Sequence, residues 1–168
     1  MTAIDLRLGE MLQGDFDPGP LNLLLAFQVN CPGCFTHALP LASALYDHYS
    51  RDDVTVIALS TVFEDFSLNT AANTRQLLDD GSLVGETAKH FQSIGVDRYP
   101  QQILFPVAMD AVGSDSIGRT FSINHFPGTP TWILFDSQSR VMASWFGHRD
   151  EQEVRRIIDD LIAKTAVS

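Results

Sequence analysis

Two cysteines separated by two residues are the strongest candidates for chemistry in this sequence. Cys31 and Cys34 enclose Pro32 and Gly33 in the stretch NCPGCF, and the 168-residue chain has 2 cysteines in all. Such a pair can bind a metal ion, form a structural disulfide or exchange disulfides with another molecule. A disulfide that closes so short a loop adds little stability. Metal binding, inert thiols and redox chemistry are therefore the alternatives to weigh.

The flanking residues predict that the cysteines lie where a buried strand meets a helix. The apolar run 21–29 is typical of a strand that is covered on both faces of its sheet. After the cysteines, apolar side chains recur at helical spacing over residues 35–50. Pro40 lies inside this predicted helix, and we expect it to kink the helix.

This position predicts a reactive Cys31. At the first turn of a helix, free backbone N–H groups and the positive end of the helix dipole favour a thiolate, the nucleophilic form of cysteine. Pro32 suits the first turn because its missing N–H would have had no partner inside the helix. Cys34 lies one helical turn further on and can attack a mixed disulfide formed at Cys31. The pattern therefore favours a redox pair.

A metal site is the first alternative. Zinc takes about four ligands, and the CxxC pair supplies half of that number. The 5 histidines include no pair at HxxxH spacing. His37 and His48 are roughly 16 Å apart along a helix, which is too far to share one ion. His125 is the best remaining candidate ligand, because it lies in a loop that we place near the cysteines; two inert core thiols are the other alternative.

Composition limits the classes of function. A chain of 168 residues suits a single domain, residues 1–168. Its net charge is −10, from 11 basic and 21 acidic residues without a basic cluster, so we expect no nucleic-acid partner. Residues 1–20 lack the features of a secretory signal, and the apolar run 21–29 is too short to cross a bilayer. We expect a soluble, cytoplasmic protein without a membrane partner, whose cysteines are reduced.

The rest of the chain predicts an α/β architecture. A second buried strand over 53–61 should run parallel to the first, since a helix connects them. Helices should follow between 64 and 100, and two strands joined by a short turn should form an antiparallel hairpin near the C-terminus. The remaining predicted elements are a strand over 104–110, a short helix over 116–121, hairpin strands over 131–136 and 140–147, and a final helix from Asp150.

The ends of the middle helices are predicted from their capping residues. Asn69 or Thr70 should begin the first of them, and Gly81 should follow its last turn. Ser82 is the predicted cap of the second. The apolar face of that second helix is predicted to consist of Leu83, Ala88, Phe91 and Ile94.

A second motif, FPGTPTWILFD, precedes the hairpin. Pro130 follows Thr129 and comes directly before a strand, which suits a residue that cannot donate a ladder hydrogen bond. Together with CPGC after an apolar strand, this motif resembles the thioredoxin superfamily. More narrowly, FPVAMD and FSINHFPGTPTWILFDSQSRV resemble TlpA-type thiol-disulfide oxidoreductases and alkyl-hydroperoxide-reductase-like proteins. The resemblance runs from about Leu21 to the C-terminus.

The resemblance implies a thioredoxin-like three-layer α/β fold, with a mixed central sheet, helices on both faces and an extra helical segment in the middle. It implies that Cys31 is the solvent-facing nucleophile and Cys34 the more buried resolving thiol. It also implies that Pro130 is a cis-proline, whose neighbour Thr129 presents its backbone to an extended partner segment. The substrate-docking residues predicted in this way are Pro32, Gly33, Thr129, Pro130 and Phe126.

Several positions depart from the family, and one of those below bears on a thiol peroxidase. Asn30 stands where the family usually has Trp, so the apolar wall beside the nucleophile must come from another residue, for which Phe126 is the candidate. Leu25 stands where thioredoxin has a buried acid, which puts the proton route to Cys34 in doubt. Gln28 stands where a thiol peroxidase has Thr, which argues against peroxidase chemistry.

The sequence thus predicts a thiol-disulfide oxidoreductase that reduces or exchanges protein disulfides. The expected partners are disulfide-containing proteins or small thiol substrates, together with an external thiol reductant. We expect no cofactor and no metal. Two alternatives remain open: a thiol peroxidase-like protein, and a non-catalytic thioredoxin-fold module that binds a metal or a protein.

Other residues near the motifs have simpler interpretations. His37, one turn after Cys34, is interpreted as a solvated histidine rather than as a group that tunes the thiol. Trp132 and Trp145 are interpreted as packing residues of the hairpin rather than as a docking surface. Glu64 and its neighbour Asp65 are interpreted as loop acids rather than as a proton relay.

Overall fold

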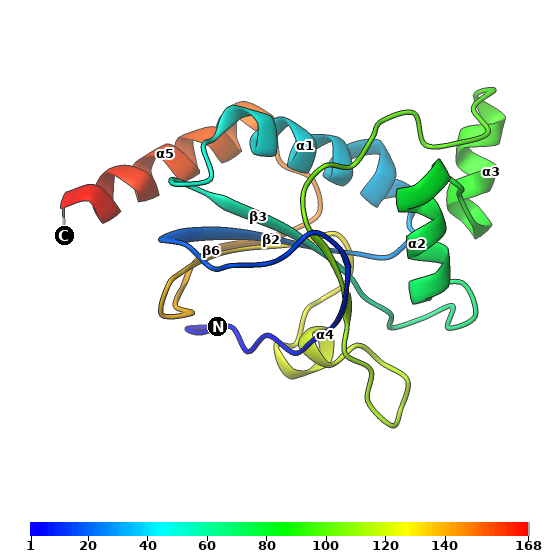
Figure 1. The fold of residues 1–168 in the computed structure, drawn as a ribbon, viewed down its shortest axis with the longest axis horizontal. Coiled ribbons are helices and arrows are strands. Elements are labelled where there is room, and N and C mark those ends of the chain that lie inside the picture. Colours follow the sequence, from blue (N-terminus) through cyan, green and yellow to red (C-terminus); the bar gives the residue numbers. More distant parts are fainter. Residues whose placement is uncertain (168) are drawn as a thin grey trace.

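The protein folds around a six-stranded mixed sheet flanked by helices (Figure 1). The structure is a computed structural model, and it describes residues 1–167. The strands are β1 (Leu8–Gln13), β2 (Leu21–Phe27), β3 (Thr55–Ser60), β4 (Val107–Asp110), β5 (Thr131–Asp136) and β6 (Val141–Phe146). The helices are η1 (Cys34–Ala38), α1 (Leu39–His48), α2 (Ala71–Asp80), α3 (Gly85–Ser93), α4 (Arg119–Ile123) and α5 (Glu151–Val167).

The strand β2 lies near the middle of the sheet, whose order is β1-β4-β3-β2-β5-β6. It runs parallel to β3, with Leu25 opposite Ala58, as the helical connection between them requires. On its other side it is antiparallel to β5, where Leu25 lies opposite Trp132. β5 and β6 form the predicted antiparallel hairpin. The prediction of a mixed sheet is confirmed.

Alternate side chains of β2 enter two separate cores, because successive side chains of a strand point to opposite faces. Leu23 and Leu25 pack with residues of α1 and α5, whereas Leu24 and Ala26 belong to the core on the other face. Figure 1 shows α1 and α5 on one side of the sheet, α4 on the other, and α2 and α3 beyond one end. The predicted three-layer arrangement with an extra helical segment is confirmed.

The helix that follows the cysteines is irregular where the proline kink was predicted. Its first part, η1, is a π-helix of 5 residues, and regular α-helix begins with Leu39. The helix continues without a break from Pro32 through η1 into α1, so Pro40 lies inside it, and a carbonyl of the preceding turn lacks the hydrogen bond that an N–H at Pro40 would donate. The π-helical segment absorbs the disturbance that a proline inside a regular helix would cause.

The capping predictions are right for α2 and wrong for α3. Thr70 caps α2, because its hydroxyl oxygen accepts a hydrogen bond of 3.1 Å from the N–H of Asn73. Ser82 caps nothing: its N–H donates to the Asp80 carboxylate at 2.9 Å in the turn after α2. The helix α3 begins later, at Gly85, without a side-chain cap.

The first strand is the element that the sequence did not predict. β1 lies at the edge of the sheet, antiparallel to β4 and with irregular register, and its half-exposed side chains give no apolar alternation.

The helix α4 begins three residues later than predicted, where the Asp110 carboxylate accepts the N–H groups of Thr120 and Phe121 at 2.9 and 3.1 Å. Ile94, predicted on the apolar face of α3, is 63% exposed.

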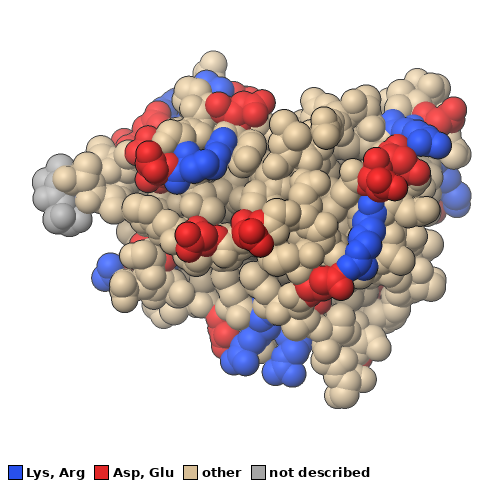
Figure 2. Space-filling view, viewed as in Figure 1, with Lys and Arg blue, Asp and Glu red and all other residues tan. Residues whose placement is uncertain are grey.

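Charged residues of both signs share the molecular surface. Figure 2 shows Lys and Arg side chains next to Asp and Glu side chains on one face. Arg75, for example, is paired with Glu10, which links α2 to β1, and Arg98 lies 3.8 Å from the Asp80 carboxylate. Exposed pairs of this kind contribute little to stability.

No helix within residues 1–167 is both long enough and apolar enough to span a membrane.

We expect Thr70→Ala to lower the free energy of unfolding by about 1 kcal/mol, because it removes the N-cap hydrogen bond of α2. The matched control is Ser82→Ala, which changes a hydroxyl outside the helix and should alter that free energy by less than about 0.5 kcal/mol. Urea denaturation followed by circular dichroism measures both. Equal losses for the two variants would contradict the assignment of the cap.

Candidate active site

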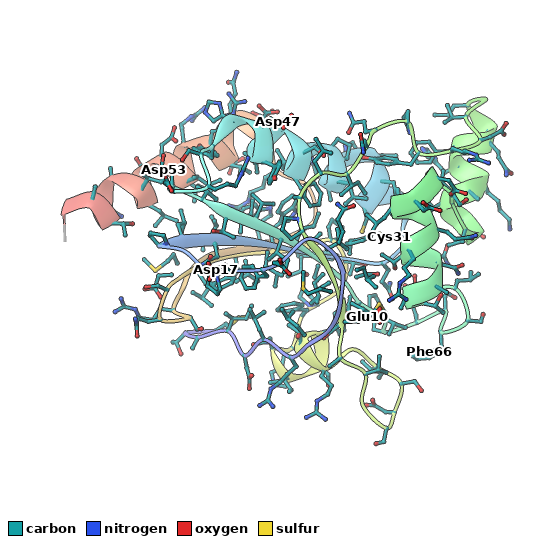
Figure 3. The ribbon with its side chains drawn as sticks, viewed as in Figure 1. Glu10, Asp17, Cys31, Asp47, Asp53 and Phe66 are labelled. Atoms are coloured by element: carbon teal, nitrogen blue, oxygen red, sulfur yellow. The ribbon has the colours of Figure 1, made fainter. Side chains whose placement is uncertain are left out.

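The two cysteines lie together where β2 leads into the helix, and Figure 3 labels Cys31 at this place. Cys31 is partly exposed and Cys34 is fully buried, and both are free thiols. The Cys34 thiol donates a hydrogen bond to the Cys31 sulfur, and the two Sγ atoms are 2.7 Å apart. The backbone N–H of Cys34 donates to the Cys31 carbonyl at 3.1 Å, which closes the turn. One sulfur is thus open to solvent and the other lies directly behind it.

The contact between the sulfurs moves their pKa values in opposite directions. The hydrogen bond from Cys34 lowers the pKa of Cys31 to about 6, against the opposing effect of burial, and the interactions with Thr129 and with the Cys34 backbone act in the same direction. Burial raises the pKa of Cys34 well above its usual value, and the neighbouring Cys31 raises it further. At neutral pH, Cys31 is therefore mainly a thiolate and Cys34 a thiol.

The loop that carries the second motif lies beside Cys31. The Cys31 sulfur is 3.7 Å from the carbonyl oxygen of Thr129, and the Thr129–Pro130 peptide bond is cis. Pro130 comes directly before β5, the strand that pairs with β2. Because β2 ends at the cysteines and β5 begins at this loop, antiparallel pairing brings the two motifs to the same edge of the sheet.

Asn30, which stands where the family usually has Trp, connects the cysteine turn to the loop after β3 and to the start of α3 through hydrogen bonds. Its N–H donates to Asn69, its amide nitrogen donates to Asp65, and its amide oxygen accepts the N–H of Glu86, each at 2.8 Å. Gly85, at φ 51, leaves room for that oxygen, since a Cβ there would meet it. Asn30 therefore joins three segments around Cys31.

The helix α3 also holds the backbone of Cys31. The hydroxyl oxygen of Thr87 accepts the N–H of Cys31 at 2.9 Å, and its own proton goes to the carbonyl of Val29 at 2.8 Å. Thr87 is fully buried. Sequence reasoning missed both Thr87 and the role of Asn30, because a lone Thr in a helix and a lone Asn before a cysteine give no local signal for a contact made across 56 residues.

Gln28 bears on peroxidase chemistry, and Leu25 and Glu64 bear on proton transfer; the first two are buried and the third is exposed. The side chain of Gln28 is buried, and its amide oxygen accepts hydrogen bonds from the N–H of Phe63 at 2.9 Å and from Asn69 at 3.1 Å. Leu25 is fully buried in the core that contains Cys34. Glu64 is exposed, and its charge acts to raise the pKa of Cys31. Gln28 thus joins the segment after β2 to the segment after β3 through these hydrogen bonds.

The structure contradicts one predicted docking residue. Phe126 is 5% exposed and lies in the core on the face of the sheet away from Cys34, where its ring packs edge-on against Phe121. The prediction that Phe126 forms an apolar wall beside Cys31 is wrong, because Phe126 and Cys31 pack against cores on opposite faces of the sheet. The other predicted docking residues lie near Cys31: Pro32 and Gly33 form the first helical turn, and Thr129 and the buried Pro130 lie in the loop before β5.

His125, the candidate metal ligand in the second loop, is exposed and has a left-handed backbone conformation with φ 54. Over residues 1–167, no group of three or more His, Cys, Asp and Glu side chains is arranged to hold a metal ion.

Solved structures share this architecture over nearly the whole chain. A thiol-disulfide isomerase from Corynebacterium glutamicum superposes with a TM-score of 0.75 at 24% identity, covering 96% of each chain. A thioredoxin-like superfamily protein gives 0.69 at 26% identity and the same coverage. A thioredoxin-like protein from Aeropyrum pernix gives 0.55 at 16% identity, covering 94% of this chain and 89% of its own.

The chain has a thioredoxin-like fold. The resemblance to the thioredoxin superfamily that the two motifs predicted is therefore confirmed by the fold. Neither a protein-family model nor a curated protein matches the sequence. The likeness lies in the three-dimensional fold, because sequence identity to the matched structures is low.

We expect Cys34→Ala to raise the pKa of Cys31 from about 6 toward the value of an ordinary cysteine, because the leading hydrogen bond to the thiolate is lost. Cys34→Ser keeps a donor and should raise that pKa less. The pH dependence of alkylation by iodoacetamide measures the pKa in each variant. An unchanged pKa in Cys34→Ala would show that the helix terminus, and not Cys34, stabilises the thiolate.

We expect Asn30→Ala to lower the free energy of unfolding by about 1–2 kcal/mol, because two side-chain hydrogen bonds are lost. Amide hydrogen exchange at the start of α3 should become faster, since the N–H of Glu86 loses its acceptor. Gln92→Ala, an exposed change on the same helix, is the control and should leave both quantities unchanged. Protection of Glu86 that survives in Asn30→Ala would argue against this role.

Proposed function

We propose that the protein is a thiol-disulfide oxidoreductase that acts through Cys31 and Cys34. The observation that carries the proposal is the pair of sulfurs 2.7 Å apart, one a partly exposed thiolate and the other a buried thiol. An exposed thiolate is the attacking group in disulfide exchange, and a nearby thiol resolves the mixed disulfide.

The first step consumes the thiolate. Cys31 attacks one sulfur of a substrate disulfide, the substrate S–S bond breaks, and its second sulfur leaves as a thiolate that takes up a proton. Cys34 then loses its proton and attacks the Cys31 sulfur, which forms the Cys31–Cys34 disulfide and releases the first substrate sulfur. The substrate gains two electrons and the protein loses two, so an external dithiol must reduce the protein before the next cycle.

The backbone carbonyl of Thr129 supports a role in substrate docking. It lies 3.7 Å from the Cys31 sulfur, beside the position that a substrate sulfur would occupy during exchange. An extended substrate segment can pair with this short edge of backbone, while Pro32, Gly33 and Pro130 form its surroundings. The docking residues proposed here are thus Pro32, Gly33, Thr129 and Pro130.

Protein disulfides and small disulfides are both candidate substrates, and an external thiol is the proposed electron donor. A cytoplasmic location, as expected from the sequence, would favour the direction in which the substrate is reduced. A redox titration of the cysteine pair against glutathione places the protein among donors or acceptors of electrons.

Thiol peroxidase activity is the second candidate reaction. It is disfavoured because Gln28 occupies the expected Thr position and its side chain is bound to Phe63 and Asn69. Binding of a metal or a protein without turnover is the third candidate, and it predicts a stoichiometric ligand in place of catalysis.

We expect the reduced protein to catalyse the reduction of insulin disulfides by dithiothreitol, and Cys31→Ser to abolish this activity. Cys34→Ser should instead accumulate a mixed disulfide through Cys31, which mass spectrometry of the unreduced protein detects. The rate of the first step should increase as the pH rises through about 6, because the thiolate forms above the pKa of Cys31.

Three outcomes would overturn the proposal. Turnover that persists in Cys31→Ser would exclude the assigned nucleophile. Consumption of hydrogen peroxide faster than disulfide reduction would favour the peroxidase. No turnover, together with a tightly bound stoichiometric metal, would favour the binding module.

A further inference from the structure

The helix that follows β2 and the helix α3 bind each other at their first turns. Cys31 comes directly before Pro32, the first helical residue after β2, and Asn30 comes before Cys31. The hydroxyl oxygen of Thr87, in the first turn of α3, accepts the N–H of Cys31 at 2.9 Å. In the other direction, the amide oxygen of Asn30 accepts the N–H of Glu86 at 2.8 Å. Each segment thus satisfies a backbone donor at the start of the other.

The hydrogen bond from the Cys31 N–H to Thr87 takes the place of one that a capping box makes inside a single helix. In a capping box, the side chain three residues after the N-cap accepts the N–H of the N-cap residue. Cys31 holds the N-cap position, and the residue three further on is Cys34, whose thiol contacts the Cys31 sulfur instead. The backbone of Cys31 is therefore held from another helix, across 56 residues of sequence.

The hydroxyl of Thr87 bridges two peptide groups on either side of Asn30. It accepts the N–H of Cys31 at 2.9 Å and donates to the carbonyl of Val29 at 2.8 Å. Thr87 and Val29 are both buried, so removal of the hydroxyl would leave a donor and an acceptor without their partner in a place that excludes water. The hydroxyl therefore fixes the backbone from Val29 to Cys31.

The position of the Cys31 sulfur depends on this backbone. The sulfur is 2.7 Å from the Cys34 sulfur and 3.7 Å from the carbonyl oxygen of Thr129. Hydrogen bonds weaken steeply when they lose alignment, and a displacement of about 1 Å can slow a reaction about a hundredfold. A small movement of the Cys31 backbone would therefore weaken the contact that stabilises its thiolate and would also spoil the approach of Cys34.

We propose that Thr87 is a positioning residue for the reaction of the cysteine pair: its hydroxyl fixes the backbone of Cys31 so that the two sulfurs stay aligned. The inference rests on the proposed function and adds a residue to it. Thr87 acts through the Cys31 backbone, so both steps depend on it. In the first, Cys31 must be ionised to attack. In the second, the bond from Cys34 to Cys31 forms as the bond from Cys31 to the substrate sulfur breaks.

The test follows the two steps in one stopped-flow trace. The reduced protein is mixed with one equivalent of dithiobis(nitrobenzoate), an aromatic disulfide. Attack by Cys31 releases one coloured thiolate, and attack by Cys34 on the mixed disulfide releases a second. The rate of the first phase reports the ionisation of Cys31, because the thiolate is the nucleophile. The rate of the second phase reports how well Cys34 is aligned with the Cys31 sulfur.

We expect Thr87→Val to slow both phases. At pH 6, near the pKa of Cys31, the first phase should slow about threefold, because a weaker contact with Cys34 leaves less thiolate. This difference should shrink at higher pH, where Cys31 is ionised in both proteins. The second phase should slow about tenfold, because the sulfurs are less well aligned. Thr87→Ser keeps the hydroxyl and should restore both rates to near those of wild type.

Thr74 provides a matched control on α2. It is fully buried, its hydroxyl donates to the Thr70 carbonyl at 2.9 Å, and it shares a second hydrogen bond of 2.7 Å with Ser60. Thr74→Val should therefore lower the free energy of unfolding, measured by urea denaturation, about as much as Thr87→Val does, and should leave both phases unchanged. If circular dichroism shows that Thr87→Val does not fold, Thr87→Ala and Thr74→Ala make the same comparison.

The wild-type trace separates the failure of this inference from the failure of the proposed function. If wild type shows both phases and Thr87→Val shows them at the same rates, Thr87 is not a positioning residue, while the oxidoreductase stands. Equal slowing in Thr74→Val, or no recovery in Thr87→Ser, would assign the effect to lost stability and would also overturn the inference. If wild type shows no second phase, Cys34 does not resolve the mixed disulfide, and both are overturned.

Discussion

The hydrogen bond from the Cys34 thiol to the Cys31 sulfur is the interaction on which the proposed chemistry depends. It stabilises negative charge on the outer sulfur and opposes it on the inner one, so two identical side chains acquire different roles. Burial strengthens the contrast, because Cys34 has no access to water. The helical turn supplies the spacing, and the core behind Cys34 supplies the low dielectric.

The helices between β3 and β4 serve as a support for this turn. Thr87 of α3 holds the Cys31 backbone, while Asn30 joins the turn to the loop after β3 and to the start of α3. Asn30 thus has a different use from the Trp that the family usually has at its position. It joins the site to its neighbours by hydrogen bonds in place of an apolar surface.

Local patterns were sufficient for most of the regular elements. The continuous apolar run of β2, the hairpin around SQS and the Thr70 cap each depend on neighbours in sequence, and each was predicted correctly. Ser82 and the first strand were not. Ser82 has the right residue type for a cap, but the chain does not enter α3 until Gly85. The strand β1 is stabilised by pairing with β4 across about a hundred residues, and its own sequence gives little sign of that.

The sequence by itself was enough to single out Cys31 and Cys34 as the candidate redox pair and the loop of Pro130 as the second motif, because the spacing of CPGC and the position of GTPT are local properties of the chain. Tertiary structure alone decided the surroundings of the sulfurs. Phe126 lies in the core on the face of the sheet opposite to Cys34. His37 contacts His148, and Thr87 binds the backbone of Cys31, because strand pairing and helix packing bring together residues that are far apart in sequence. A spacing pattern records only what one segment can do, and the partners of a side chain depend on contacts between segments that no single stretch contains.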